Sequence, residues 1–400
     1  MKQLAAPAIL SGAYAYANTL TRLIPELYQA IDVVSRELVG FIPSVTRNAS
    51  AERAAVGEPI VYAITPELPA FDVTPSMAIP EPADRTIGND ALVITKSKGV
   101  EFGWTGEEQK GLNNGPGYLT VQADLFAQGL RTLTNLIELD LAVEAYQNAS
   151  RATGTPGTTP FATNVGEAAQ VRKILDDNGA PLSERSLIID TAAGANLRTL
   201  KQLTAVNEAG TSMTLRDGML LDLAGFAIKE SAQIQNPVIG TNAGATTGAA
   251  GSPVGSTVIP TAAAGTGSIL AGDYITFAGD TNRYLVKVGK ANVATGTASI
   301  EIAKPGLRVA IPTSATTITT VARGSRSIGF TRSAIHLAAR APALPQGGDA
   351  AIDRFILVDP RSGIPFEVSL YAGYRKIRAE VAMAWGVKAT KQAHIAGLLG

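Results

Sequence analysis

The chain ends on EVAMAWGVKATKQAHIAGLLG (residues 380–400), in which apolar residues far outnumber charged ones. The first part of this stretch, with the residues just before it, alternates between apolar positions and positions that are charged or small. The apolar set is Ile377, Ala379, Val381, Met383, Trp385 and Val387, and the intervening set is Arg378, Glu380, Ala382, Ala384, Gly386 and Lys388. A period of two predicts a long strand with one buried face. The end of the chain is therefore expected to be a core strand followed by a short tail, and not a membrane anchor.

The strongest helix signal lies between Leu119 and Asn148, a stretch with no proline and a single glycine, Gly129. Its apolar residues recur at helical spacing and form one stripe, made of Phe126, Leu130, Leu133, Ile137 and Leu141. Leu136, Leu139, Val143 and Tyr146 widen that stripe. A helix of this length spans about 45 Å, at 1.5 Å of rise per residue. Its wide apolar face predicts a spine that is covered on more than one side.

Two segments before the spine have different characters. Residues 18–41 carry apolar residues at helical spacing, which predicts either a helix that packs on the core or an arm that packs on a neighbouring chain. Residues 59–65 and 91–106 are expected to be strands, and the residues between them are rich in proline, including Pro80 and Pro82. Proline excludes helix and confines strands to sheet edges, so this segment is predicted to be a long extended hairpin.

After the spine, the pattern becomes that of an α/β domain and then changes again. Residues 165–179 and 192–203 are predicted helices, and residues 186–190 and 225–231 are predicted strands. Residues 151–160 and the uncharged, glycine-rich residues 240–268 are expected to be linkers. Beyond them, several short strand candidates separated by turns predict a small β-barrel or sandwich inserted into the chain. Asp273 and Asp280 each follow a glycine there, which is typical of turns rather than of a calcium site.

The sequence gives no support for an enzyme. It contains no cysteine and only two histidines, His336 and His394, and it has no nucleophile elbow, zinc-protease motif or phosphate-binding loop. We therefore expect no catalytic residue, no cofactor and no metal site. The 34 basic and 34 acidic residues cancel, which argues against a protein that grips nucleic acid through its phosphates. The alanine-rich start of the chain leaves a cleaved signal peptide as an alternative, and no stretch is long and apolar enough to predict a transmembrane helix.

Three stretches carry a resemblance to a known family. LAGDYITFAGDTNRYLV (270–286), GFTRSAIHLAARAPALP (329–345) and residues 358–400, with the step WGVKA at Trp385–Ala389, are similar to coat proteins of the P-twenty-two type. These are major capsid proteins of tailed bacteriophages with the shell fold named for bacteriophage Hong Kong ninety-seven. The likeness is specific in the last third of the chain, whereas residues 1–235 match the family in the order of their parts.

The resemblance implies an α+β fold with an inserted β-barrel. The expected parts are an N-terminal helical arm (1–45), an extended hairpin loop (46–112), a peripheral domain with the spine helix 119–148 (113–164), an axial α/β domain (165–235), the inserted barrel (236–326), the return of the axial domain (327–357), and peripheral strands with a tail (358–400). The tail is expected to pack on its own subunit or on a neighbour. Residues expected to serve structure or assembly are Phe126, Leu130, Leu133, Ile137, Leu141, Val381, Met383, Trp385, Val387, Asp273, Pro80 and Pro82.

The same resemblance implies a role and a set of partners. The chain would form hexamers and pentamers of itself in an icosahedral shell, assembled in the bacterial cytoplasm with a scaffolding protein and a portal protein. The shell would enclose packaged double-stranded DNA without sequence-specific binding, and no membrane would be involved. The alternatives are another virion protein, such as a tail or decoration protein, a secreted β-rich binding module, and a hydrolase, for which no catalytic base is evident.

Overall fold

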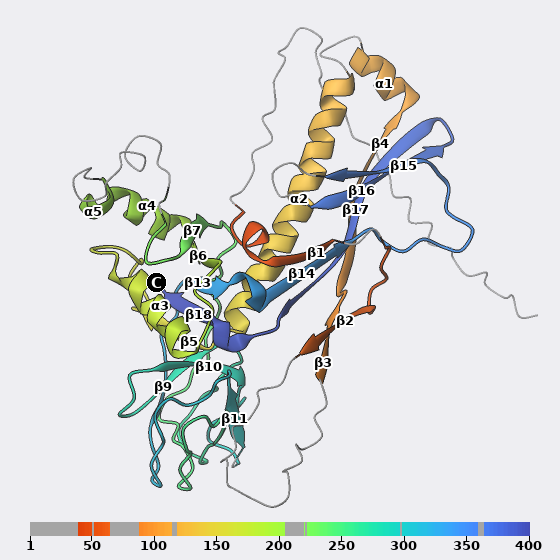
Figure 1. The fold of residues 1–400 in the computed structure, drawn as a ribbon. Helices are drawn as coiled ribbons and strands as arrows, with labels where there is room; N and C mark the ends of the chain where they lie inside the picture. The colour runs from red at the N-terminus through yellow and green to blue at the C-terminus, as the bar shows by residue number, and fades with distance from the viewer. Residues whose placement is uncertain are drawn as a thin grey trace, which may run out of the picture.

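The computed structural model describes residues 39–49, 52–64, 88–113, 118–204, 220, 222–296, 298–358 and 364–400. Most of the predicted helix 18–41 lies outside these ranges, as do Pro80 and Pro82. The described part is a mixed α+β structure in which two sheets share one long helix (Figure 1).

The first sheet is built around the long strand near the end of the chain. Strand β17 (Lys376–Ala389) pairs with β16 and then β14 along one edge, and with β4 along the other. The strand order is β1-β14-β17-β16-β15, with β4 on the free edge of β17. The remaining bounds are β1 Thr46–Ala49, β4 Lys96–Thr105, β14 Ile335–Arg340, β15 Ala351–Val358 and β16 Pro365–Gly373. A two-stranded ribbon, β2 (Pro59–Ile64) and β3 (Gly88–Val93), leads into β4.

Helix α2 (Tyr118–Gln147) lies across this sheet and begins and ends one residue before the predicted bounds. Its apolar stripe packs against the inward face of β17, where Val381, Met383 and Trp385 are fully buried. A short helix that was not predicted, α1 (Gly106–Asn113), precedes it. Thr105 and Glu108 form its capping box: the Thr105 amide donates to Glu108 Oε2 over 2.8 Å, and the Glu108 amide donates to Thr105 Oγ1 over 3.3 Å. The sequence TGEE at residues 105–108 contains this capping-box pattern.

The second sheet has ten strands, nine of which come from residues 151–331 and one from the last residues of the chain. Its order is β12-β9-β10-β5-β18-β13-β6-β7, with β11 joining β10 to β8. The strands are β5 Arg151–Gly154, β6 Arg185–Ile189, β7 Ala227–Glu230, β8 Val258–Pro260, β9 Tyr274–Phe277, β10 Arg283–Val288, β11 Ser299–Ile302, β12 Ile318–Thr320, β13 Arg326–Thr331 and β18 Ile395–Leu399. Helices α3 (Gly166–Asp177), α4 (Thr191–Thr199) and α5 (Lys201–Thr204) follow in the same region, and α3 and α4 bury their apolar residues against one face of the sheet. Within the described residues there are also three short 3₁₀ helices: η1 Ile42–Ser44, η2 Arg332–Ala334 and η3 Gln392–His394.

The prediction of a C-terminal tail is wrong. Residues 395–399 form β18, which lies between β5 and β13 inside the ten-stranded sheet. Ile395 and Leu399 face the core shared with α2, whereas Ala396 and Leu398 face the core under α3. A strand that is buried on both faces is apolar at every position, so the period of two that reveals a half-buried strand is missing.

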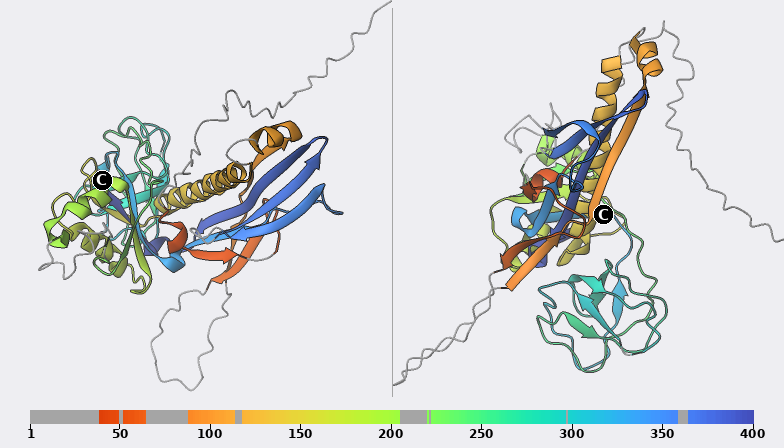
Figure 2. Two further views of the ribbon diagram at one scale, coloured as in Figure 1. Left: turned by 90° about the horizontal axis from the view of Figure 1, so that it is seen from above. Right: turned by 90° about the vertical axis from the view of Figure 1, so that its right-hand side faces the viewer.

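The prediction that residues 151–160 and 240–268 are linkers is also wrong. Residues 151–154 form β5, which pairs with both β18 and β10. The glycine-rich stretch contributes Ala245 and Ile259 to a separate small core and pairs through bridges such as Thr247 with Thr261. We call residues 236–326 the small β unit; it forms a compact body at one end of the molecule, at the bottom of Figure 1 and of the right-hand view of Figure 2. Because β10 pairs with β5, the unit continues the sheet of the body.

Trp385→Ala should destabilise the fold by about 3–5 kcal/mol, because a fully buried ring is removed from the core beneath α2. Trp385→Phe should cost less, about 1–3 kcal/mol, since it keeps most of the packing. It loses the indole hydrogen bond that Nε1 donates to Asp140 Oδ2 over 2.8 Å. Urea denaturation of the two variants checks this order. Equal stability of Trp385→Ala and the unmodified chain would contradict the packing of β17 under the helix.

Candidate functional site

The residues expected to serve structure or assembly fall into three places. Leu130, Leu133, Ile137 and Leu141 meet Val381, Met383 and Trp385 in one fully or nearly fully buried core. Phe126 and Val387 pack at its margin and are only partly buried, with Phe126 edge-on to Phe102 at 4.8 Å between ring centres. Asp273 lies elsewhere, in the small β unit. Pro80 and Pro82 are outside the described residues, so their expected role stays a prediction.

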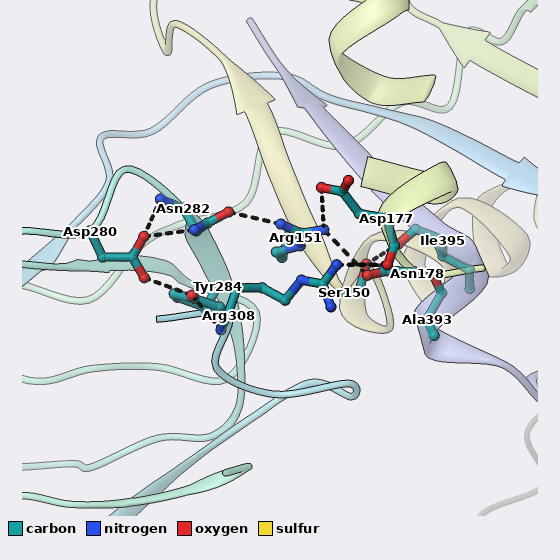
Figure 3. Close-up of polar contacts among 10 residues, drawn as sticks. All are labelled: Ser150, Arg151, Asp177, Asn178, Asp280, Asn282, Tyr284, Arg308, Ala393 and Ile395. Atoms are coloured by element: carbon teal, nitrogen blue, oxygen red, sulfur yellow. Dashed lines mark hydrogen bonds and ion pairs between the residues drawn. The ribbon is translucent and has the colours of Figure 1, made fainter. Parts of the chain in front are cut away.

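A polar joint ties the small β unit to the body, and Arg151 lies at its centre (Figure 3). Arg151 begins β5 and is 4% exposed. Its Nη1 donates to Asn282 Oδ1 over 2.8 Å, and its Nη2 donates to Asp177 Oδ2 and Asn178 Oδ1, each over 3.3 Å. Burial and the nearby Arg308 lower the pKa of the Arg151 guanidinium, and Asp177 opposes that shift. One buried cation therefore connects the small unit with the end of α3.

Within the small unit, Asp280 accepts the hydrogen bonds that hold the other residues of the joint in place (Figure 3). Asp280 Oδ1 accepts from the Asn282 backbone amide and from Asn282 Nδ2, which orients the amide that receives Arg151. The Tyr284 hydroxyl donates to Asp280 Oδ2 over 2.6 Å and accepts from the Arg308 amide over 2.9 Å. Burial and Asp280 raise the pKa of Tyr284, so its hydroxyl keeps its proton. Arg308 Nη2 donates to the Asp177 carbonyl over 2.6 Å, which crosses the joint a second time.

On the side of the body, the joint reaches the end of the chain. Asn178, which follows α3, donates from Nδ2 to the Ala393 carbonyl over 2.8 Å and to Ser150 Oγ over 3.0 Å. The Ser150 hydroxyl donates to the Ile395 carbonyl over 2.8 Å. These contacts place β18 beside β5. The joint thus holds four parts of the chain at fixed positions, and its groups are engaged with one another rather than presented to a substrate.

Asp273 and Arg326 lie near one another at the seam where the small unit begins and ends. Asp273 is buried and accepts the backbone amides of Leu270, over 2.7 Å, and Gly240, over 3.0 Å. Burial raises the pKa of the Asp273 carboxyl, although these hydrogen bonds and the Arg326 charge oppose that change. Arg326 is 1% exposed and lies over the Tyr274 ring, 4.6 Å from its centre. Asp273 thus anchors the turn that starts at Leu270 and fixes the backbone at Gly240, which agrees with the interpretation of Gly-Asp as turn chemistry.

Sequence reasoning missed a second buried acid, Glu138, on the apolar face of α2. Glu138 is fully buried, and its Oε1 accepts from the amides of Gly40 (2.7 Å) and Phe41 (2.8 Å) and from Ser231 Oγ (2.7 Å). Its Oε2 accepts from the Ile42 amide over 3.0 Å. An acid inside a wide apolar stripe was the signal that could have revealed it, because a buried carboxylate needs several donors. Burial raises the pKa of Glu138, and the four donors act in the opposite direction.

The described residues contain no group of three or more acidic or histidine side chains placed to hold a metal ion. Among the helices that the structure describes, none combines the length and the apolar content that crossing a bilayer requires. The geometry of the joint and of Glu138 is that of structural polar networks.

No protein-family model matches the sequence, and a search of curated proteins found no match either. Solved structures do match over almost the whole chain. A chain in a structure of Mycobacterium phage Che8 covers 94% of this chain and 97% of its own length, with a TM-score of 0.50 and 12% identity. A chain from the capsid structure of the cyanophage P-SCSP1u covers 96% of this chain and 93% of its own length, with a TM-score of 0.49 and 12% identity. A chain of the mature capsid of bacteriophage PhiM1 covers 94% and 91%, with a TM-score of 0.46 and 12% identity. The chain therefore shares its fold with the phage Che8 chain over 94% of its length.

Arg151→Met should destabilise the chain by about 2 kcal/mol, because the acceptors in the joint lose their charged donor. The loss should be largest locally, so hydrogen exchange at the amides of β9 and β10 should accelerate more than exchange in β17. Arg332→Met is the matched control, since Arg332 pairs with Glu184 at the surface and a pair of that kind contributes about 0.5 kcal/mol or less. Unchanged exchange in β9 and β10 of Arg151→Met would show that the joint does not position the small unit.

Because of Glu138, the free energy of unfolding should decrease as pH rises from mildly acidic values. Its pKa is raised in the folded state, so the folded chain binds more protons than the unfolded chain above the ordinary carboxyl value of 4.5. Stability from this group is therefore greatest below that value and decreases as pH rises through the folded-state pKa. Glu138→Gln should be less stable at every pH, because the amide nitrogen that replaces Oε2 cannot accept from the Ile42 amide, and it should lose this component of the pH dependence. Urea denaturation of both proteins between pH 4 and pH 8 measures the difference; identical profiles would contradict it.

Proposed function

We propose that this chain is the major capsid protein of a tailed bacteriophage, a subunit that assembles with copies of itself into the icosahedral shell around packaged double-stranded DNA. The observation that carries the proposal is the fold shared with the phage Che8 chain over 94% of this chain and 97% of that one. A match over more than nine-tenths of both chains supports one architecture rather than a single common motif. The likeness of residues 270–286, 329–345 and 358–400 to phage coat proteins supports the role within the virion.

The architecture supports the finer assignment to the Hong Kong ninety-seven shell fold. Under this proposal, α2 is the spine helix and the sheet around β17 belongs to the peripheral domain. The axial domain consists of α3 and α4 with β5, β6, β7, β13 and β18 of the ten-stranded sheet, and residues 236–326, which contribute the other five strands, are the inserted β-barrel. Their separate buried core, which includes Ile259, Tyr284 and Ile300, is consistent with such an insertion. The domain bounds expected from the sequence stand as part of this proposal, except that β5 and β18 lie in the sheet assigned to the axial domain.

The partners follow from the same role. Hexamers and pentamers of the chain would build the shell, with a scaffolding protein and a portal protein taking part in assembly in the host cytoplasm. A formal net charge of zero suits a container, because a strongly basic inner wall would bind the packaged DNA tightly. The polar networks described above fit a structural role, in which side chains hold elements in place.

Electron microscopy of the purified chain tests the proposal, first alone and then after co-expression with the scaffolding protein of the same phage. We expect closed shells of one or a few sizes in the second sample, since scaffolds promote closure. Trp385→Ala is the matched control and should give no shells, because its subunit is destabilised. A folded, monodisperse 41.4 kDa monomer in the presence of scaffold would overturn the proposal.

A further inference from the structure

The two-stranded ribbon of β2 and β3 is held against the first sheet by a small apolar cluster. The ribbon extends from the sheet where β3 leads into β4 (Figure 1). Leu92 of β3 packs with Ala338 of β14 and Ala384 of β17, and Ile60 and Tyr62 of β2 lie at the margin of this cluster. A two-stranded ribbon is only marginally stable on its own in water. Docking on the sheet therefore decides whether the ribbon keeps its structure.

Four side chains join the ribbon to the sheet beside this cluster, and we call them the latch: Tyr62, Asp90, His336 and Lys388. The Tyr62 ring lies nearly parallel to the His336 ring, with 5.6 Å between the ring centres. The Tyr62 hydroxyl donates to Asp90 Oδ2 over 2.7 Å, and Lys388 Nζ forms an ion pair with Asp90 Oδ1. Lys388 Nζ also donates to the Ala91 carbonyl over 2.9 Å. Two side chains of the ribbon thus meet two side chains of the sheet.

His336 is half-buried and is the member of the latch whose charge can change near neutral pH. Strand pairing places it opposite Lys388 of β17 on one side and Thr46 of β1 on the other. Residues directly opposite one another in neighbouring strands have their side chains on the same face of the sheet. A proton on His336 would therefore add a second cation beside Lys388, whose partner Asp90 is already engaged.

The surroundings of the latch separate the titrations of its members. Burial lowers the pKa of His336, and a hydrogen bond with the Ser333 backbone opposes that shift. Burial and Asp90 raise the pKa of Tyr62, so its hydroxyl stays neutral. The hydrogen bond from Lys388 holds the pKa of Asp90 below its usual value, so this carboxylate stays ionised. In mildly acidic solution, His336 gains its proton while Tyr62 and Asp90 keep their charge states.

We propose that the latch is a proton-sensitive switch: the ribbon is docked on the first sheet while His336 is neutral, and protonation of His336 releases it. The docked chain binds fewer protons here than the released chain, whose imidazole has the ordinary pKa of 6.5. Docking is thus favoured in full above that value and weakens as pH falls from there toward the lowered pKa of the docked state. This inference does not depend on the proposed function, because it concerns the free subunit.

Hydrogen exchange of the full-length chain between pH 8 and pH 5 tests the switch. At each pH, protection of the β2 and β3 amides is compared with protection of the β16 and β17 amides, which corrects for the intrinsic pH dependence of exchange. We expect the relative protection of the ribbon to fall several-fold, because the released ribbon is marginally stable and its amides open. The fall cannot exceed about 30-fold, since pH 5 lies about 1.5 units below the ordinary histidine value. An unchanged ratio over this range would overturn the proposal.

Substitutions assign the switch to one residue. His336→Gln and His336→Phe cannot take up a proton, so their relative protection should be the same at pH 5 and pH 8, and the phenylalanine keeps a ring against Tyr62. His394→Gln is the matched control, because His394 is the other histidine of the chain and lies just before β18. It should retain the fall seen in the unmodified chain. The same fall in both His336 variants would overturn the assignment.

Nuclear magnetic resonance of the imidazole signals measures the protonation itself. Comparison of the unmodified chain with His394→Gln identifies the His336 signals, because the chain has two histidines. We expect His336 to titrate with a pKa below 6.5. A cation over an aromatic ring is attracted to it, and a pKa above 6.5 would show that this attraction by Tyr62 outweighs burial. That result would overturn the proposal, since protonation would then strengthen the latch.

Discussion

Helix α2 is the element on which the rest of the structure depends, because its wide apolar face can be buried only if both sheets are present. Leu133, Ile137 and Leu141 contact one continuous core, which receives Val381 and Trp385 from the first sheet and Ile328 and Leu399 from the second. Neither sheet could cover that face alone. Glu138 adds a polar constraint on the same helix, since its four donors fix the chain just before β1 to α2 and to the loop after β7. The two halves of the molecule are therefore coupled through one helix.

The middle of the ten-stranded sheet is built from segments that are far apart in the sequence. Strand β18 comes from the last residues and lies between β5 and β13, and β5 also carries β10 of the small unit. The side chains of Arg151 and Ser150, at the start of β5, also connect this strand to the small unit and to the end of the chain. Pairings of such high sequence separation form late and slowly, since the loop entropy is lost before the contacts are gained. A separate core in the small unit can form from local contacts before the sheet around it is complete.

The elements that sequence reasoning could predict are those with one buried face. Helix α2 and strand β17 show periods of 3.6 and 2 because one side meets the core and the other does not. Strand β18 is apolar on both faces, and β5, with the letters RATG, is too short and too polar to stand out, so neither has a readable period. The joint could not be predicted either, because the hydrogen bonds among Arg151, Asn178 and Asn282 form only when three distant segments of the chain meet. The order of the helices, strands and β-rich segment along the chain, by contrast, could be predicted from the sequence and was enough to suggest the fold.

The far end of the first sheet depends on pairing of the same kind. There Lys376 of β17 pairs with Thr105 of β4, so one strand comes from the first third of the chain and the other from its end. During synthesis the N-terminal part is made first, and the Trp104 side chain has no neighbouring strand until β17 arrives. Since β17 also closes the core under α2, the pairing that completes this end of the sheet also completes the core that keeps the subunit folded.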